Sequence, residues 1–298
     1  MKILLLGKNG QLGWELQRSL APLGEVIALQ RTSQDYCGDL TNLQGLATTI
    51  QQIAPDIIVN AAAYTAVDKA ESEAELAQLI NADAPAILAQ QAKLIGAWLI
   101  HYSTDYVFDG SGTTPWQESD TSSPLSVYGA SKLAGEQAIQ DSGCQHLIFR
   151  TSWVYATRGN NFAKTMLRLA RERDNLSVIN DQIGAPTGAD LLADVTAHVI
   201  RTLQTAPELA GLYHLVASGE TSWHGFSSFV IDYAQKQGDN LKTTVEAIAA
   251  VPTSAFPTTA KRPNNSRLNT DKLQTNFALT LPDWQSGVTR MLTEILEK

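Results

Sequence analysis

The stretch Lys2-Ile-Leu-Leu-Leu-Gly7-Lys-Asn-Gly10-Gln-Leu-Gly13 decides the fold of this 298-residue chain. It opens with a short unbroken apolar run that stops at a glycine, which is typical of a buried parallel strand. Glycines spaced GxxGxxG follow, and a helical pattern then runs from Trp14 to Leu20. Glycines permit a tight turn and a close approach of the backbone to a pyrophosphate, and the N-terminus of the next helix attracts phosphate. The three parts together favour a dinucleotide-binding site over an ordinary glycine-rich turn.

Outward from this unit, the chain alternates between strands and helices up to about residue 155. Strands are expected at 25–30, 55–63, 97–102 and 145–150, and helices at 42–53, 71–78, 85–95 and about 124–141. This alternation predicts an α/β fold with a Rossmann-like, doubly wound parallel sheet. Ligands of such sheets bind outside the carboxyl ends of the strands.

The second half of the chain has a looser pattern. Helices are expected at 160–170, 189–203, 223–237 and from Pro282, strands at 176–180 and 212–216, and a proline-rich run spans 252–263. We predict an NAD(P)-binding Rossmann domain over residues 1–155. A smaller, partly interleaved C-terminal lobe over residues 156–298 is expected to bind the substrate.

The composition is that of an ordinary globular protein, with 44% hydrophobic and 17% charged residues. The net charge of −8 argues against nucleic acid or an anionic membrane as the main partner. The two cysteines, Cys37 and Cys144, form no disulfide framework and no metal-binding spacing, which indicates a reducing compartment. With no signal peptide and no apolar run of membrane-spanning length, a cytoplasmic protein is expected.

The end of the second expected strand bears on the choice of cofactor. A site specific for NAD would place an acidic residue there to bind the ribose 2′-hydroxyl. The chain has Gln30-Arg31-Thr32-Ser33 instead. With no acid present and with Arg31 able to meet a 2′-phosphate, NADPH is the expected cofactor and NADH the alternative.

The stretch Tyr128-Gly-Ala-Ser-Lys132 carries the catalytic prediction. On a helix, a phenol and an ammonium four residues apart lie on one face, and the cation is expected to lower the tyrosine pKa. Such a tyrosine can transfer a proton to or from a carbonyl or hydroxyl. Tyr-x-x-x-Lys also arises by chance, but other segments end at the same edge of the expected sheet. These segments are Gly7–Gly13, Ala61–Ala63, Ser103–Asp105 and the region of Trp153.

Several stretches together resemble the extended short-chain dehydrogenase/reductases that act on nucleotide sugars. More narrowly, they are similar to the dTDP-4-dehydrorhamnose reductases, and the likeness covers nearly the whole chain. The stretches are GxxGxxG, Asn60-Ala-Ala-Ala63, Ser103-Thr-Asp-Tyr-Val-Phe-Asp-Gly110, Tyr128-Gly-Ala-Ser-Lys-Leu-Ala-Gly-Glu136, Arg150-Thr-Ser-Trp-Val-Tyr155, Asp181-Gln-Ile-Gly-Ala-Pro-Thr187 and Arg262-Pro-Asn-Asn-Ser266.

The resemblance implies that NAD(P)H reduces the C4 ketone of dTDP-4-dehydro-6-deoxy-L-mannose to give dTDP-L-rhamnose, the last step of dTDP-rhamnose biosynthesis. Tyr128 would donate the proton, Lys132 would bind the nicotinamide ribose, and Thr104 would hydrogen-bond the C4 oxygen. Asp105 and Trp153 would contact the sugar and Arg262 its diphosphate. From pattern and resemblance together, the expected cofactor-binding residues are Gly7, Gly10, Gln11, Leu12, Gly13, Gln30, Arg31, Asp39, Leu40, Ala61, Ala62, Ala63, Tyr64, Thr65, Tyr102, Tyr128 and Lys132.

A metal site is a further implication of the resemblance. Some members bind structural Mg2+ between subunits, and Glu15, Asp190 and Asp194 are the matching candidates here, with a solvated acidic face as the competing interpretation. The chain is accordingly expected to be a monomer or a homodimer. Four of the five histidines, His101, His146, His198 and His214, are interpreted as structural, and His224 is assigned to a loop or helix cap.

Related functions remain as alternatives. Sugar dehydratases place Asp-Glu after the threonine, whereas this chain has Asp105-Tyr106, which disfavours elimination of water. C4 epimerases share the Tyr/Lys pair but match the region from Ser103 to Gly110 less well. A reductase of another nucleotide-linked 4-keto-6-deoxy sugar stays open, and a non-catalytic regulatory subunit is disfavoured by the intact Thr104, Tyr128 and Lys132.

Overall fold

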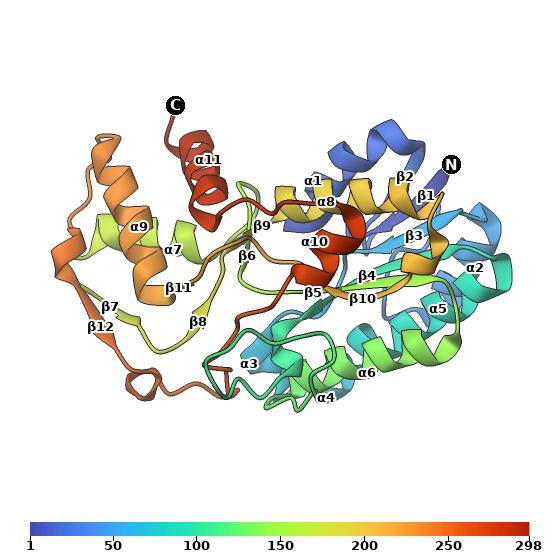
Figure 1. Ribbon diagram of the computed structural model, residues 1–298, viewed down its shortest axis with the longest axis horizontal. Coiled ribbons are helices and arrows are strands. Elements are labelled where there is room, and N and C mark those ends of the chain that lie inside the picture. The colour runs from blue at the N-terminus through green and yellow to red at the C-terminus, as the bar shows by residue number, and fades with distance from the viewer. Residues whose placement is uncertain (298) are drawn as a thin grey trace.

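A computed structural model describes residues 1–297, and a sheet of six parallel strands lies at its centre (Figure 1). The strand order is β10-β5-β4-β3-β1-β2. The strands are β1 (Lys2–Leu6), β2 (Glu25–Leu29), β3 (Ile57–Asn60), β4 (Trp98–Thr104), β5 (His146–Thr151) and β10 (Gly211–His214). The order reverses beside β1, as in a doubly wound Rossmann fold, so the predicted fold class is confirmed.

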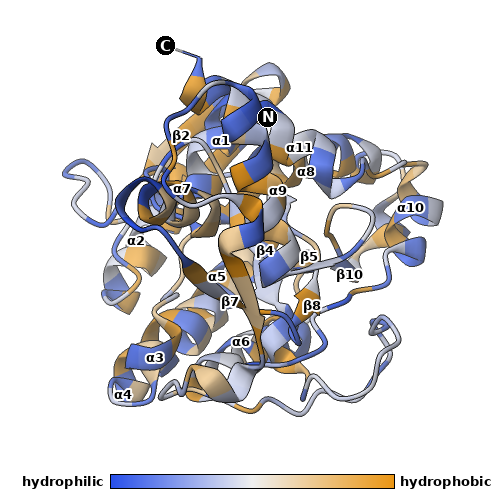
Figure 2. Ribbon diagram, turned by 90° about the vertical axis from the view of Figure 1, so that its left-hand side faces the viewer, coloured by the Kyte–Doolittle hydropathy of each residue, from blue (hydrophilic) through white to orange (hydrophobic). Residues whose placement is uncertain are grey.

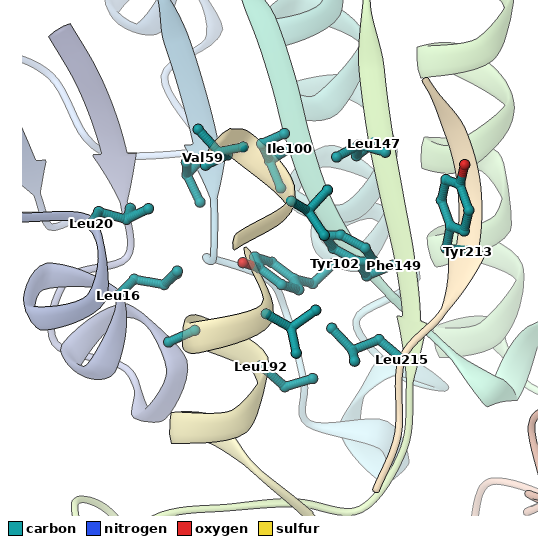
Figure 3. Close-up of a cluster of buried hydrophobic side chains, with 14 of the residues drawn as sticks. Leu16, Leu20, Val59, Ile100, Tyr102, Leu147, Phe149, Leu192, Tyr213 and Leu215 are labelled. Carbon is teal, nitrogen blue, oxygen red and sulfur yellow. The ribbon is translucent and has the colours of Figure 1, made fainter. Parts of the chain in front are cut away.

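Helices cover both faces of this sheet. On one face, α1 (Gln11–Leu20) and α8 (Ala189–Leu203) pack on apolar side chains of the strands, as Figure 3 shows for Leu16, Leu192, Ile100 and Phe149. The opposite face is covered by α2 (Leu43–Ile53), α5 (Ala84–Ile95) and α6 (Val127–Ser142). Successive strand residues alternate between the two faces. Ile100 and Tyr102 therefore join the first cluster, and Leu99 joins the second.

The C-terminal part adds a second group of elements with apolar clusters of their own. It contains α7 (Phe162–Glu172), α9 (Trp223–Lys236), α11 (Trp284–Leu296) and the parallel pair β7 (Leu176–Ile179) and β12 (Ile248–Val251). Figure 2 shows the helices with orange apolar and blue polar stretches, as expected for helices that bury one side. Short pairs join β6 (Val154–Tyr155) to β9 (Thr187–Gly188), and β8 (Ile183–Gly184) to β11 (Thr221–Ser222).

Residues beyond 155 also complete the central sheet. β10 pairs with β5, and α8 packs against α1. Residues beyond 155 therefore contribute a strand and a helix to the N-terminal fold, so the two parts of the chain share one sheet. The division at residue 155 stays a prediction.

Some expected elements have different bounds. The strand expected at 55–63 ends at Asn60, and residues 61–66 form irregular backbone along a cavity. The helix expected at 71–78 is two short helices, α3 (Val67–Ala70) and α4 (Ala74–Gln78), and a π turn at Leu79–Asp83 links α4 to α5. Sequence reasoning missed α10 (Asp271–Phe277) and β12. Among the described residues, no helix is both long and apolar enough to cross a membrane.

Candidate active site

The glycine-rich turn joins β1 to α1 and has no room for side chains. Gly7 has φ +89°, and a Cβ there would lie 2.9 Å from the carbonyl carbon of Ala61. A Cβ on Gly13 would lie 2.1 Å from the Gly7 oxygen, a distance that requires the backbone to move. Helix α1 starts at Gln11 with no side-chain cap, which leaves its first N–H groups free for phosphate oxygens.

A cavity of about 680 Å³ opens beside this turn. The structure gathers there every predicted cofactor-binding residue except Gly13 and Tyr64. Gly13 supports the turn from behind, and the Tyr64 hydroxyl donates to Glu73 Oε2 at 2.5 Å. The predicted residues in the lining are Gly7, Gly10, Gln11, Leu12, Gln30, Arg31, Asp39, Leu40, Ala61, Ala62, Ala63, Thr65, Tyr102, Tyr128 and Lys132.

Arg31 lines the cavity two residues after the end of β2. Its side chain is 75% exposed, and its Nε donates to Asp39 Oδ2 at 3.3 Å. Asp39 is held in turn by Thr41, whose backbone N and hydroxyl both donate to Oδ1. The guanidinium is therefore placed at the open edge of the cavity with part of its hydrogen-bonding capacity free.

Tyr128 lines the same cavity, and the Thr104 side chain lies beside it. Thr104 ends β4, where its buried hydroxyl donates to Asp105 Oδ1 at 3.1 Å and accepts from the Tyr106 backbone N at 3.2 Å. Tyr128 lies in the first turn of α6, which Ser126 caps. Burial raises the pKa of Tyr128 to about 12, although a side-chain hydrogen bond with Thr104 acts to lower it. The phenol therefore carries its proton at neutral pH.

Lys132 does not lower this pKa in the ligand-free chain, contrary to the expectation from spacing. Its Nζ is turned to the Tyr102 carbonyl oxygen, at 2.6 Å, and to His101 Nε2, at 3.2 Å. Lys132 is only 2% exposed, and burial lowers its pKa to about 8 against the opposing charge of Glu136. The expected same-face geometry is present, but the local electrostatics are dominated by burial. The role of Lys132 toward a bound ribose stays a prediction.

Buried polar atoms without partners mark the remaining space at the ends of β4 and β5. They are Ser103 Oγ, Asp105 Oδ2, Thr151 Oγ1 and Ser152 Oγ. Burial raises the pKa of Asp105 to about 6, with hydrogen bonds from Ser266 and Thr104 acting against it. Buried polar groups normally have a hydrogen-bond partner. A hydroxyl-rich or phosphorylated ligand fits this region, because it can supply the missing partners.

Trp153 is held in an unusual conformation. It has φ +50°, which is rare for a bulky side chain, and its indole stacks on Trp223 at a centroid distance of 3.6 Å. A Cβ on Gly184 would lie 2.9 Å from the Trp153 ring, so this position has room only for glycine. Strained residues are frequent at ligand-binding sites. The predicted contact of Trp153 with a sugar stays a prediction.

Arg262 is already paired within the chain. Its Nη2 donates to Asp68 Oδ2 at 2.6 Å and its Nη1 to Asp68 Oδ1 at 3.1 Å. It also hydrogen-bonds Tyr106, whose ring meets Tyr128 edge-on at 5.5 Å. The guanidinium thus lies near Tyr128, but a diphosphate would have to compete with Asp68 for it.

The predicted metal ligands do not form a site within one chain. Asp194 Oδ1 accepts from Arg18 at 2.9 Å, Glu15 lies 3.5 Å from the same arginine, and Asp190 lies 3.5 Å from Arg290. Over residues 1–297, no group of three His, Cys, Asp or Glu side chains could hold a metal ion. The predicted magnesium site would lie between subunits, which a single chain does not test, so it stays a prediction. Each carboxylate has an arginine beside it, which neutralises the charge that would attract a cation.

Sequence reasoning also missed residues that hold the site together. The Asn81 amide accepts from the Tyr64 backbone N and donates to the Tyr64 carbonyl and to Ser131 Oγ, at 2.9–3.0 Å. It thereby ties the cavity wall to the catalytic helix. Asn81 lies in the π turn, a feature that no periodic pattern predicts. His101, interpreted as structural, contacts Lys132 directly.

A second cavity, of about 650 Å³, lies along α6 and contains none of the predicted site residues. Its lining includes the buried Arg150–Glu136 ion pair, with Nη2 and Oε2 2.6 Å apart. The convergence of turn, strand ends and catalytic helix therefore distinguishes the first cavity as the candidate active site.

Comparisons with known proteins agree with this geometry. A family model described as the RmlD substrate binding domain matches residues 1–297. The dTDP-4-dehydrorhamnose reductases of Salmonella typhimurium and Shigella flexneri are 64% and 63% identical over 295 residues, which cover 99% of this chain and 98% of each relative. The solved dTDP-4-dehydrorhamnose reductase of Bacillus anthracis, in complex with NADP, has a TM-score of 0.87 and 37% identity and covers 98% of this chain and 99% of its own. The chain therefore belongs to the dTDP-4-dehydrorhamnose reductase family of oxidoreductases.

Proposed function

We propose that this protein reduces the C4 ketone of dTDP-4-dehydro-6-deoxy-L-mannose with NADPH and so forms dTDP-L-rhamnose. One observation carries the proposal: Tyr128, which is hydrogen-bonded to Thr104, and Lys132 line the same cavity as the glycine-rich turn. Family membership adds the class of sugar. Two free cysteines support a reducing compartment, which we take to be the cytoplasm.

The residues of the cavity fit a nicotinamide dinucleotide. A side chain at Gly7 or Gly13 would clash with the surrounding backbone, and the first N–H groups of α1 have no side-chain cap. Ser103 and Thr151 line the same cavity with hydroxyl groups that have no partner. Arg31 would meet the adenosine 2′-phosphate and Lys132 the nicotinamide ribose. When bound, the reduced nicotinamide supplies the hydride.

Tyr128 is the general acid of the proposed reaction. Addition of hydride to the C4 carbon breaks the C=O π bond and leaves its electron pair on oxygen. The Tyr128 hydroxyl, protonated at neutral pH because burial raises its pKa to about 12, gives its proton to that oxygen. Thr104 hydrogen-bonds the Tyr128 side chain and can turn its own hydroxyl toward the same oxygen. A carbon–hydrogen and an oxygen–hydrogen bond are formed, and the tyrosinate is then reprotonated.

The identities of Asp105 and Tyr106 favour reduction of the ketone over elimination of water. Asp105 is buried, with Oδ2 free to accept from a sugar hydroxyl. The next residue is a tyrosine packed on Tyr128, where a dehydratase would need a carboxylate. The site therefore has Asp105 but lacks, at position 106, the second carboxylate that dehydration would need.

The test is a coupled assay. The dTDP-4-keto sugar is supplied together with its 3,5-epimerase, NADPH oxidation is followed by absorbance, and the product is identified by NMR. We expect stoichiometric oxidation and a rhamnose-configured product. No oxidation by protein that binds NADPH would refute a reductase, and a product of another configuration would assign the enzyme to a different 4-keto-6-deoxy sugar.

A further inference from the structure

His101 lies directly behind the catalytic lysine. The β3–β4 register places His101 opposite Asn60, and both side chains point to the face covered by α6. His101 Nε2 lies 3.2 Å from Lys132 Nζ, and His101 Nδ1 lies 3.1 Å from Asn60 Nδ2. All three residues are at most 2% exposed, so water does not compete for these hydrogen bonds.

The His101 imidazole has two hydrogen-bonding neighbours, Asn60 and Lys132, but only one ring proton when it is neutral. Burial lowers the pKa of His101 well below its ordinary value, so the ring is neutral and has one N–H and one lone pair. The Ala62 backbone N donates to Asn60 Oδ1 at 3.2 Å, which turns Asn60 Nδ2 toward His101. Asn60 thus donates to Nδ1, and the ring proton lies on Nε2, facing Lys132.

Lys132 completes this chain of hydrogen bonds. In the described geometry it accepts from His101 and donates to the Tyr102 carbonyl at 2.6 Å, which is the pattern of an uncharged amine. A charged Lys132 would need a lone pair on Nε2. The ring proton would then move to Nδ1, the Asn60 amide would turn over, and the Ala62 N–H would lose its partner. The charge on Lys132 is therefore coupled to Asn60 through one imidazole.

We propose that His101, oriented by Asn60, is a positioning residue for the reduction: it holds the Lys132 amine against the cofactor cavity and sets whether that amine donates or accepts. The proposal rests on the proposed function of the site. The other ionisable groups of α6 near Lys132 are Tyr128 and Glu136, one turn to either side, and Glu136 pairs with Arg150 on β5. Asp105 acts on Tyr128 instead. Among the described residues, the amine hydrogen-bonds His101 and the Tyr102 carbonyl and none of these groups.

Three substitutions separate the two ring nitrogens. His101→Gln places an amide where Nε2 was and keeps a partner for Lys132. His101→Asn reaches only the Nδ1 position and keeps a partner for Asn60. His101→Leu keeps neither. His146→Leu, at the amino end of the neighbouring strand β5, is the matched control, because His146 contacts the Cys144 carbonyl and lies outside the cavity lining.

We expect kcat/KM and NADPH affinity to fall about 10- to 100-fold in the Asn and Leu variants, because the buried Lys132 amine is left without one of its hydrogen-bond partners. The Gln variant should recover to within about threefold. Its amide can turn its oxygen to Lys132, which favours the ammonium, so the alkaline limb of its pH profile should move to higher pH. Thermal melting would show that the variants fold.

Equal activity of the Asn and Gln variants, or near-normal NADPH affinity in folded His101→Leu, would overturn the proposal. NADPH affinity is measured by fluorescence titration without sugar. If the wild-type protein reduces no sugar, the proposed function fails, yet the titrations still decide whether His101 positions Lys132.

Discussion

The cofactor end and the sugar end of the site are built in different ways. At the cofactor end, short continuous segments such as Gly7–Leu12 and Ala61–Ala63 line the cavity, largely through their backbone. At the sugar end, two of the predicted side chains are held by residues from remote segments. Trp153 stacks on Trp223, and Arg262 pairs with Asp68 across 194 positions of sequence. The first end depends on local conformation, whereas the second depends on how the C-terminal part meets the sheet.

This difference predicts different responses to substitution. Changes at the catalytic group should abolish chemistry, and changes in the turn should abolish cofactor binding. Changes at the sugar end should alter the KM of the sugar and leave the cofactor bound. Five measurements, from the largest expected effect to the smallest, test the contrast.

Tyr128→Phe should lower kcat by about 10²- to 10⁴-fold, the range of general acid catalysis. The substitution removes the proton donor and keeps the edge-on contact with Tyr106. Single-turnover kinetics and an NADPH titration measure the two properties separately. Turnover near the wild-type rate would refute the role of the phenol, and loss of NADPH binding would show that Tyr128 belongs to the cofactor end instead.

Gly13→Ala should weaken NADPH binding at least about 100-fold, because displaced N–H donors no longer meet the pyrophosphate. The new methyl would lie 2.1 Å from the Gly7 oxygen. In Gly10→Ala the methyl would lie 3.4 Å from that oxygen, an ordinary contact, so this matched variant should lose less. NADPH titration of both variants, with circular dichroism as a check of folding, tests whether the glycine-rich turn binds the pyrophosphate. Equal NADPH affinities of the two variants would contradict this role.

Arg262→Gln should raise the KM of the sugar about 10- to 50-fold, as expected for a lost hydrogen bond to a charged group, with little change in NADPH affinity. Asp68→Asn supplies the contrast, because it frees the guanidinium from its ion pair. If Arg262 binds the diphosphate, Asp68→Asn should lower the KM. If the Arg262–Asp68 ion pair only joins the two segments that carry these residues, both variants should raise the KM of the sugar.

Trp223→Leu should raise the KM of the sugar by up to about tenfold, in keeping with the loss of one aromatic stack. Without its partner at 3.6 Å, Trp153 can leave its φ +50° conformation. Steady-state kinetics with each substrate varied in turn measures the effect. A matching rise in the KM of NADPH would show that the two ends are not independent.

Arg31→Ala should have the smallest effect, a loss of about three- to tenfold in kcat/KM with NADPH and none with NADH. The side chain is 75% exposed, so solvent screens its attraction for a 2′-phosphate. Parallel assays with both cofactors at two salt concentrations measure the selectivity. An equal loss of kcat/KM with both cofactors would refute the prediction that Arg31 favours NADPH over NADH.

The fold could be predicted because its signals are local. A buried strand, a turn that needs glycine and a helix follow one another within the first 20 residues, and strands go on alternating with helices up to β5. The family assignment is confirmed because its motifs are continuous stretches. A strand was predicted at 212–216, close to the observed β10, but its place in the central sheet was not, since pairing with β5 is a contact between residues far apart in sequence.

The sequence by itself determined the parallel sheet, the phosphate turn and the Tyr128–Lys132 spacing, because backbone sterics and helical periodicity act over a few residues. Only the tertiary structure decided the state of those groups. Burial raised the pKa of Tyr128, and His101 hydrogen-bonds the Lys132 amine. Asp68 forms an ion pair with Arg262, and arginines lie beside the predicted metal ligands. Desolvation and pairing depend on which side chains meet in three dimensions, and that information lies in long-range contacts rather than in any single stretch.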